Sequence, residues 1–348
     1  MRREHTKKRR SFRAPTIDDV AKLAGVSTAT VSRCLNTPDM VNPDTRVRVI
    51  NAVAELGYEP NFGARVMAAK RSNTIGAIIP TMENAIFARG LQAFQEELDQ
   101  NGYTLLVASS SYQADLEKKQ LRTLLARGAD AMLLIGFARG EEIYDMLTDR
   151  QVPTIVAWSY KPEAQVASVG FDNKAAMREF TDFIFKHGHR KVAVISAPTA
   201  DNDRAAERVA GIKESAADNG IDVEELDIVE VNYSIENGAR AAHGLLTSED
   251  RPTVLVCGND VLAIGALKAA RDLKLRVPED LSITGFDDIE LAQIADPGLT
   301  TVHVPHREMG RRAANLLIKM VETSQTPQSE KLATRIVNRG TLGMAPTS

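Results

Sequence analysis

The chain has 348 residues, of which 43% are hydrophobic and 26% charged, a globular composition with enough length for more than one domain. The longest apolar runs, such as residues 131–138, fall well short of the roughly 20 residues that a membrane-spanning helix needs, so we expect no membrane contact. Two cysteines, Cys34 and Cys257, are too few for a disulfide framework and stand beside no metal-ligand motif. We therefore expect a reducing, cytoplasmic setting.

Charge is unevenly distributed along the chain. Residues 1–71 carry 14 Lys and Arg against 7 Asp and Glu, a net charge of +7, whereas the remainder carries −10. A basic head on an acidic body predicts that the head binds a polyanion. Residues 1–15, MRREHTKKRRSFRAP, lack the apolar stretch of a secretory signal, and we interpret them as a disordered basic tail.

Residues 16–60 have the pattern of three short helices. Thr16 is a suitable N-cap for a helix over residues 17–24, and a glycine turn follows. Ser27 is a suitable cap for a second helix that runs to about residue 36. A third helix is expected over residues 43–56, with Pro43 in its first turn. Its predicted buried stripe is Val49, Ile50, Val53 and Leu56.

The second of these helices has an unusual outer face. Thr28, Ala29, Ser32, Arg33 and Asn36 share that face, and none of them is acidic. Small side chains would let the helix axis approach the floor of a major groove. An arginine there can donate two hydrogen bonds to guanine O6 and N7, while hydroxyl groups can reach a base edge or a phosphate.

The segment TIDDVAKLAGVSTATVSRCLN, followed by TRVRVINAVAELGYEPN, resembles the headpiece of the LacI/GalR repressor family. The signature V-S-x-x-T-V-S-R-x-L-N stands at residues 26–36. The resemblance implies a helix-turn-helix DNA-binding domain over residues 16–60. Its DNA-contacting positions would be Thr16, Ser27, Thr28, Ala29, Thr30, Ser32, Arg33 and Asn36.

Residues 61–72 are expected to form a hinge helix or linker. Asn61 can cap a helix through residue 69 that is too short to be stable alone in water, so we expect it to order on DNA. In the resembled family, paired hinge helices wedge an apolar side chain, usually leucine, into the minor groove. Met67 stands at that position here and can still act as an apolar wedge. Without the resemblance, a plain linker would be the simpler interpretation.

From residue 73 to 340, short apolar runs alternate with amphipathic helical segments, the pattern of parallel sheets covered by helices. The length predicts two lobes with a ligand site between them, beyond the carboxyl ends of the strands. The resemblance implies an α/β periplasmic-binding-protein-like sensor of two doubly wound parallel-sheet lobes joined by three crossovers. We place lobe N at about 73–172 and 304–331, and lobe C at about 173–303 and 332–340.

The resemblance also assigns residues to an effector site in the cleft. The assigned positions combine one arginine, one amide, two carboxylates and two aromatic rings, a set that suits a sugar, a sugar acid or a related polar metabolite. Trp158 is the only tryptophan and stands where the family often has Asp. The full set is Phe87, Trp158, Asp172, Arg208, Asn259 and Asp287.

The chain has no phosphate-binding glycine loop, dinucleotide fingerprint or nucleophile elbow, so we expect no enzyme activity, cofactor or metal. We expect packing roles for His303 and His306. The predicted function is a transcriptional repressor that binds a pseudo-palindromic operator as a homodimer, or as a dimer of dimers. Helix 307–321 and the first sensor helix are candidate interface elements. The alternative is a solute-binding protein for sugar transport or sensing that does not regulate DNA.

Overall fold

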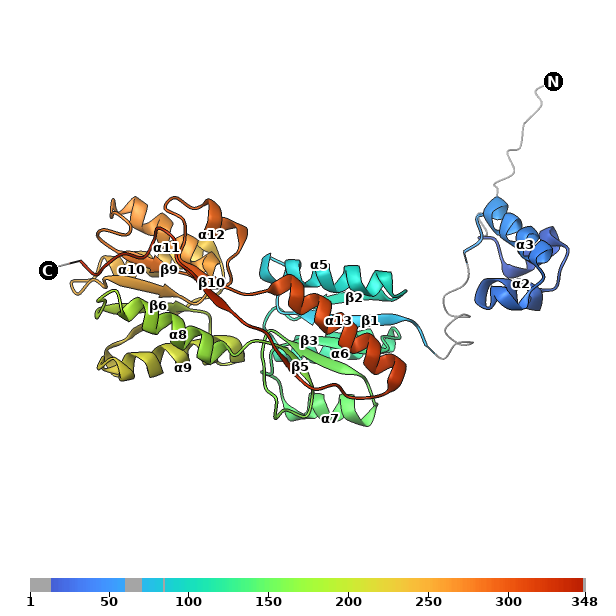
Figure 1. Cartoon of the computed structure of the whole chain (residues 1–348), viewed down its shortest axis with the longest axis horizontal. Coiled ribbons are helices and arrows are strands. Elements are labelled where there is room, and N and C mark those ends of the chain that lie inside the picture. The colour runs from blue at the N-terminus through green and yellow to red at the C-terminus, as the bar shows by residue number, and fades with distance from the viewer. Residues whose placement is uncertain (1–13, 60–70, 84, 347–348) are drawn as a thin grey trace, which may run out of the picture. The chain divides into compact units, whose positions relative to one another are not determined.

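The computed structural model describes residues 14–59, 71–83 and 85–346. The chain divides into two compact units, and the boundary along the sequence lies between Ser72 and Asn73 (Figure 1). The predicted basic tail, Asn61, Met67 and most of the predicted hinge lie outside the described residues. Within the described ranges, no helix is long and apolar enough to cross a membrane.

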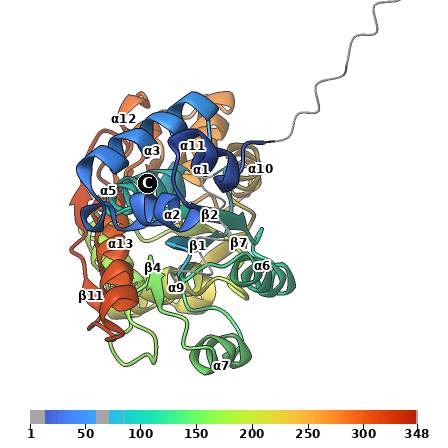
Figure 2. The same ribbon diagram turned by 90° about the vertical axis from the view of Figure 1, so that its right-hand side faces the viewer.

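The first unit is a bundle of three α-helices around a small core (Figure 2). The helices are α1 (Ile17–Ala24), α2 (Thr28–Asn36) and α3 (Pro43–Leu56), with a short 3₁₀ turn η1 (Pro38–Met40) between the last two. Gly25 ends α1 with a φ of 67°, a left-handed conformation that glycine adopts without a steric penalty, and so turns the chain toward α2. The core contains Val20, Ala21, Ala24, Val31, Cys34, Val49, Ala52 and Tyr58.

One expected core residue of this unit lies on the surface. Ile50 is 48% exposed, so its predicted burial is wrong. The stripe that packs inward on α3 is Val49, Ala52, Val53 and Leu56, which recur at three- and four-residue spacing. Ile50 stands one residue past Val49, about 100° around the helix, and therefore points away from that stripe.

The second unit has two large sheets, each the centre of one lobe, and a small sheet of two strands (Figure 1). The lobe N sheet has the order β11-β5-β4-β3-β1-β2 and is parallel throughout. Its strands are β1 (Thr74–Ile79), β2 (Thr104–Ser109), β3 (Ala131–Ile135), β4 (Thr154–Ala157), β5 (Ser168–Gly170) and β11 (Glu330–Lys331). The helices of lobe N are α5 (Ala85–Gln100), α6 (Ala114–Ala126), α7 (Glu141–Asp149) and α13 (His306–Thr323).

The lobe C sheet has the order β7-β6-β8-β9 and is also parallel. Its strands are β6 (Val192–Ser196), β7 (Asp227–Glu230), β8 (Val254–Cys257) and β9 (Ser282–Thr284). Its helices are α8 (Asn173–Phe185), α9 (Asp203–Asp218), η2 (Val223–Glu225), α10 (Ile235–Leu246), α11 (Asp260–Asp272) and α12 (Glu290–Ile294).

The chain passes between the lobes three times, after β5, between β9 and α13, and after β11. The second and third passages contain β10 (Thr301–His303) and β12 (Arg335–Val337), which pair antiparallel with each other. The first passage leads directly into α8. The lobes are therefore connected by three separate segments of the chain, and two of these segments are hydrogen-bonded to each other.

Both faces of the lobe N sheet are buried, which explains the continuous apolar runs in its strands. On β1, Ile75, Ala77 and Ile79 join the same cluster as α5 and α13, whereas Ile78 packs with the side of α6 and α7. Figure 2 shows these two pairs of helices on opposite sides of the sheet. The alternation of side chains along a strand thus divides each run between two helical layers.

Candidate functional site

The structure exposes the predicted outer face of α2. Thr28, Ala29, Arg33 and Asn36 are exposed, while Val31 and Cys34 on the opposite face are buried in the core. Within the described part of the chain, the Arg33 guanidinium makes no hydrogen bond or ion pair. A free arginine on a face without carboxylates is suited to a polyanionic surface.

The other predicted DNA-contacting hydroxyls take part in local hydrogen bonds. Ser27 Oγ accepts the Thr30 N–H at 3.2 Å and lies 2.9 Å from the Thr30 hydroxyl, so it caps α2. Asn36 Nδ2 donates to Ser32 Oγ at 3.2 Å. Thr16 forms a capping box with Asp19 at the start of α1. These bonds hold the two helix starts in place, and the DNA contacts of these residues stay a prediction.

In the second unit, three of the predicted effector residues have polar side chains buried near one another in lobe C. Asp287 is 1% exposed, and neither of its carboxylate oxygens has a hydrogen-bond partner among the described residues. Burial raises the pKa of Asp287 to about 7, against the opposing effect of the Arg208 and Arg204 guanidinium groups. A buried carboxylate that lacks hydrogen-bond donors lowers the stability of the folded protein. Such a carboxylate marks a place where a ligand can supply the donors.

Asn259 leaves a second buried polar group without a partner. Its Oδ1 accepts the Leu262 N–H at 3.0 Å and so caps α11, but its Nδ2 has no partner among the described residues. The next residue, Asp260, accepts hydrogen bonds from the Thr301 hydroxyl and the Ile289 N–H. The amide of Asn259 is thus fixed by the cap and leaves two donor hydrogens for another molecule.

Arg208 is held in place by three residues of lobe C. Its Nε donates to Asn173 Oδ1 at 2.9 Å and its Nη1 to the Gly258 carbonyl at 2.6 Å. The guanidinium carbon also lies 4.3 Å from the centre of the Phe286 ring, a cation–π contact. These contacts orient the guanidinium before any ligand arrives.

Asp287, Asn259 and Arg208 together form a polar group of side chains. The aromatic residues predicted for the site lie behind this polar group and do not line an open cavity. Phe87 and Trp158 are each 2% exposed and meet edge to face, with ring centres 5.5 Å apart. Trp158 Nε1 donates to His306 Nδ1 at 3.2 Å, and His306 Nε2 lies 3.3 Å from the Asp287 carbonyl. Burial lowers the pKa of His306 to about 3, so the ring is neutral and its Nε2 carries the proton.

The structure gives Asp172 a different role from the predicted one. Its Oδ1 accepts the Ala175 N–H as the cap of α8, and its Oδ2 pairs with Lys331 at 3.3 Å. The residue that faces the cleft at this crossover is its neighbour Asn173, which is fully buried and bridges the Trp158 carbonyl and Arg208. The effector contact of Asp172 stays a prediction, and the sequence did not point to Asn173.

A cavity of about 410 Å³ opens between the carboxyl ends of β1 and β2 in lobe N and of β6 and β7 in lobe C. Tyr112 and Tyr233 face each other across it, with ring centres 6.1 Å apart. Burial and Tyr233 raise the pKa of Tyr112, while Arg204 and Arg208 oppose this shift, so the cavity adjoins the polar group. Neither tyrosine was predicted from the sequence, since each stands in a loop and belongs to no recognisable motif. The lining residues are Thr81, Glu83, Ser111, Tyr112, Ala197, Pro198, Ala200, Asp201, Asn202, Asn232 and Tyr233.

Residues 16–61 match the family described as bacterial regulatory proteins, lacI family, and residues 181–342 match a periplasmic binding protein-like domain. The chain is 32% identical to catabolite control protein A of Priestia megaterium, across 90% of this chain and 95% of that protein. The chain belongs to the LacI family. It is also 32% identical to the HTH-type transcriptional repressor PurR of Escherichia coli O139:H28, across 95% of this chain and 98% of the relative.

Solved structures agree with this membership. A lac repressor dimer bound to operator and the anti-inducer ONPF superposes with a TM-score of 0.86 at 26% identity, over 95% of this chain and all of the other. The predicted fold, a helix-turn-helix unit with an α/β periplasmic-binding-protein-like sensor, is thereby confirmed. The chain is a LacI-family transcriptional repressor with a DNA-binding domain, and its named relatives are regulators of transcription rather than enzymes. Among the described residues, no three His, Cys, Asp or Glu side chains gather as metal ligands.

Proposed function

We propose that this LacI-family repressor binds a pseudo-palindromic operator as a homodimer and releases or holds it according to a small polyhydroxylated effector in the cleft between its lobes. The observation that carries the proposal is the pair of buried, unpartnered groups at Asp287 and Asn259 beside an oriented Arg208. A regulator of transcription works where the chromosome is, so we place it in the cytoplasm.

The arrangement of donors and acceptors favours a sugar or sugar acid as the effector. Asp287 can accept hydrogen bonds from two neighbouring hydroxyl groups, while Asn259 and Arg208 can donate to hydroxyl or carboxylate oxygens. The adjoining cavity of about 410 Å³ has the size of a small-molecule site, and its two tyrosines offer flat apolar faces to a ring. Phe87 and Trp158, which were predicted to contact the effector, would form the wall of the site behind the ligand.

DNA recognition is proposed to use α2 in the major groove. The exposed Arg33 would read a guanine, with Thr28 and Ala29 against neighbouring base edges. Because two copies of the family's reading helix require a two-fold site, the operator would contain two half-sites with the same symmetry as the protein. The hinge contacts of Asn61 and Met67 complete this proposal on the strength of the family resemblance.

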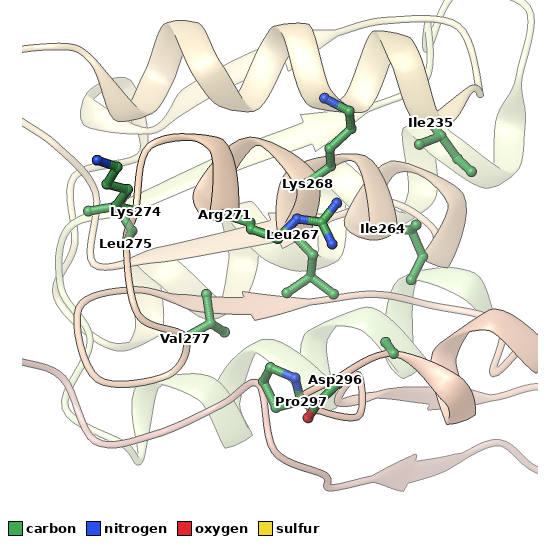
Figure 3. A pocket seen from close by; sticks show the side chains of 11 residues that line it. Ile235, Ile264, Leu267, Lys268, Arg271, Lys274, Leu275, Val277, Asp296 and Pro297 are labelled. Carbon is green, nitrogen blue, oxygen red and sulfur yellow. The ribbon is translucent and has the colours of Figure 1, made fainter.

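A groove on lobe C is the proposed contact with the second copy (Figure 3). Apolar side chains of α11 and the loop after it, including Leu267 and Val277, form its floor, and Lys268, Arg271 and Lys274 surround it. Ile294, one residue before the lining segment 295–297, is 76% exposed. Exposed apolar groups around a concave surface are typical of a protein interface. The interface elements expected from sequence, α5 and α13, pack their apolar faces against each other within one chain.

The dimer is tested by Ile294→Glu and sedimentation velocity. The substitution places a charge in the proposed interface, so the protein should sediment as a monomer and bind a full palindromic operator more weakly. Met344→Glu, which changes another exposed apolar side chain (69%) of the second unit, serves as a control and should stay dimeric. An Ile294→Glu protein that remains a dimer places the interface elsewhere.

DNA reading is tested by selecting preferred duplexes from a random library and measuring binding of the wild type and of Arg33→Ala by fluorescence anisotropy. Loss of one guanine contact should weaken specific binding by about 1–3 kcal/mol and relax the preference at one base position. Arg178→Ala, which removes an exposed arginine of the sensor, should leave binding unchanged. Failure to select any preferred duplex, with or without sugars and sugar acids, contradicts the proposal.

A further inference from the structure

One carboxylate reaches from lobe C into lobe N at the side of the cleft. Asp203 is the first residue of α9, yet its Oδ2 accepts the Phe137 N–H at 2.7 Å and the Ser159 hydroxyl at 2.9 Å. Both donors belong to lobe N, where they follow β3 and β4. The Asp203 side chain is 9% exposed, so these bonds are largely shielded from water. One oxygen atom therefore connects the two lobes through two donors.

Asp203 keeps its negative charge in this position. Burial by itself would raise the pKa of Asp203, but the adjacent Arg204 guanidinium and the bonds from Phe137 and Ser159 outweigh it, and the pKa is lowered. Hydrogen bonds that involve a charged acceptor are roughly twice as strong as those between neutral groups. The contact is thus a charge-assisted one between lobes, and it forms without any effector.

The loop after β3, which donates a hydrogen bond to Asp203 from Phe137, is held in one conformation by Arg139. The Arg139 guanidinium donates to the Ile135 carbonyl at 3.1 Å and to the Gly136 carbonyl at 2.6 Å, and it pairs with Glu117 at 2.8 Å. The Arg139 side chain is only 4% exposed. This network fixes the carbonyls directly before Phe137, so the Phe137 N–H points to Asp203 from a rigid support.

Gly136 provides the space for this approach. Its φ of 68° lies in the left-handed region, and a Cβ there would overlap the Arg204 guanidinium and the Asp203 carboxylate. The start of α9 therefore fits against this loop only because the position lacks a side chain. Two ion pairs also join the lobes, Lys161 with Glu207 at 3.5 Å and Arg89 with Glu290 at 2.6 Å, but their side chains are more exposed than Asp203 and contribute less.

We propose that Asp203 is a latch that holds the two lobes together before the effector binds. The inference rests on the proposed function, because the latch sets how readily the lobes take the arrangement that encloses the ligand. An effector that binds the latched arrangement needs to supply less free energy for closure, and one that binds the open arrangement has to break the latch. Asp203 touches neither Asp287 nor Asn259 through any hydrogen bond of the described residues, so it acts on affinity through the lobes.

The latch is tested on the full-length protein without DNA or effector. Hydrogen–deuterium exchange of the Phe137 amide reports the bond itself, and acrylamide quenching of Trp158, the only tryptophan, reports opening beside Ser159. Asp203→Ala should make the Phe137 amide exchange about tenfold faster or more, since a hydrogen bond to a charged group is lost. Trp158 should also become more accessible to the quencher.

The matched control is Asp218→Ala, which removes a carboxylate from the other end of α9, where it pairs with Arg178 inside lobe C. It should leave both readouts within twofold of the wild type. Unchanged Phe137 exchange and Trp158 quenching in Asp203→Ala would refute the latch. Should Asp203→Ala prove unfolded by circular dichroism, Ser159→Ala decides: faster Phe137 exchange supports the latch, and wild-type exchange overturns it.

Because neither readout involves DNA or a sugar, the result is independent of whether the operator and effector proposals hold. A protein that failed to select DNA could still show the latch, and a repressor with a confirmed operator could lack it.

Discussion

Replacing Asp287 by asparagine removes the charge at the centre of the polar group while keeping the size of the side chain. Burial raises the pKa of Asp287 from 3.8 to about 7, so the folded sensor binds this proton more tightly than the unfolded chain does. The stabilisation from the bound proton is therefore complete below pH 3.8 and is lost as the pH rises to about 7. The shift corresponds to about 4 kcal/mol at 1.36 kcal/mol per pKa unit.

The Asn variant lacks this titration, so its stability relative to the wild type should increase by up to about 4 kcal/mol between pH 4 and pH 8. The assay is urea unfolding at several pH values, followed by the fluorescence of Trp158, which lies in the second unit. Asp172→Asn is the control: its carboxylate already has a backbone donor and Lys331 as partners, and removing it should give no gain at pH 8.

If the difference between Asp287→Asn and the wild type is the same at pH 5 and pH 8, Asp287 carries no uncompensated charge and the argument for its ligand role fails. The expected gain in stability should come with a loss of effector binding, because an amide offers only one acceptor oxygen where the carboxylate offers two. Such an exchange of stability for binding is common at functional sites.

Three further predictions concern the framework. Ser27→Ala should lower the stability of the first unit by about 1 kcal/mol, because the N-cap bond to Thr30 is lost, and an unchanged thermal midpoint of the helical signal in that unit would contradict this. Leu134→Ala should destabilise the sensor by about 2–5 kcal/mol in urea unfolding, since it leaves a cavity in a fully buried strand. Gly310→Ala should cost about 1–3 kcal/mol because the new methyl group overlaps the main chain of α5, whereas Gly244→Ala, which meets only open space, should not destabilise.

The sequence predicted most of the architecture because its strongest patterns are local. Strands such as β1, β3 and β8 coincide with the apolar runs from which the parallel sheets were predicted, since burial on both faces leaves them almost without polar residues. The strands β5, β7 and β10 to β12 lie outside those runs, because each contains at most two hydrophobic residues and so carries no readable period. β7 in particular is half exposed at the edge of its sheet.

Residues of the candidate site were predictable only where the residue type and its position in a family motif were enough to assign them. Family resemblance pointed to Asp287, Asn259 and Arg208, and the structure buries all three side chains, but their contact with an effector stays a prediction. Asn173, which accepts a hydrogen bond from Arg208, was not predicted, because the direction of a side chain at a helix start depends on a single position in the turn. The tyrosines of the cavity and the Asp203 contact join segments far apart in sequence, and no local pattern reveals such pairs.

The small hydrophobic core of the first unit should also give this unit a lower unfolding temperature than the sensor. Its core contains valine, alanine and cysteine with one tyrosine, whereas the sensor buries several phenylalanines and a tryptophan. A unit of about 60 residues removes only about 60% of its surface from water, against about 75% for one of 300 residues. On warming, the DNA-reading helices should come apart in a separate calorimetric transition below that of the sensor. Heating would then abolish DNA binding while the sensor unit is still folded, so the smaller part of the chain would set the upper temperature for repression.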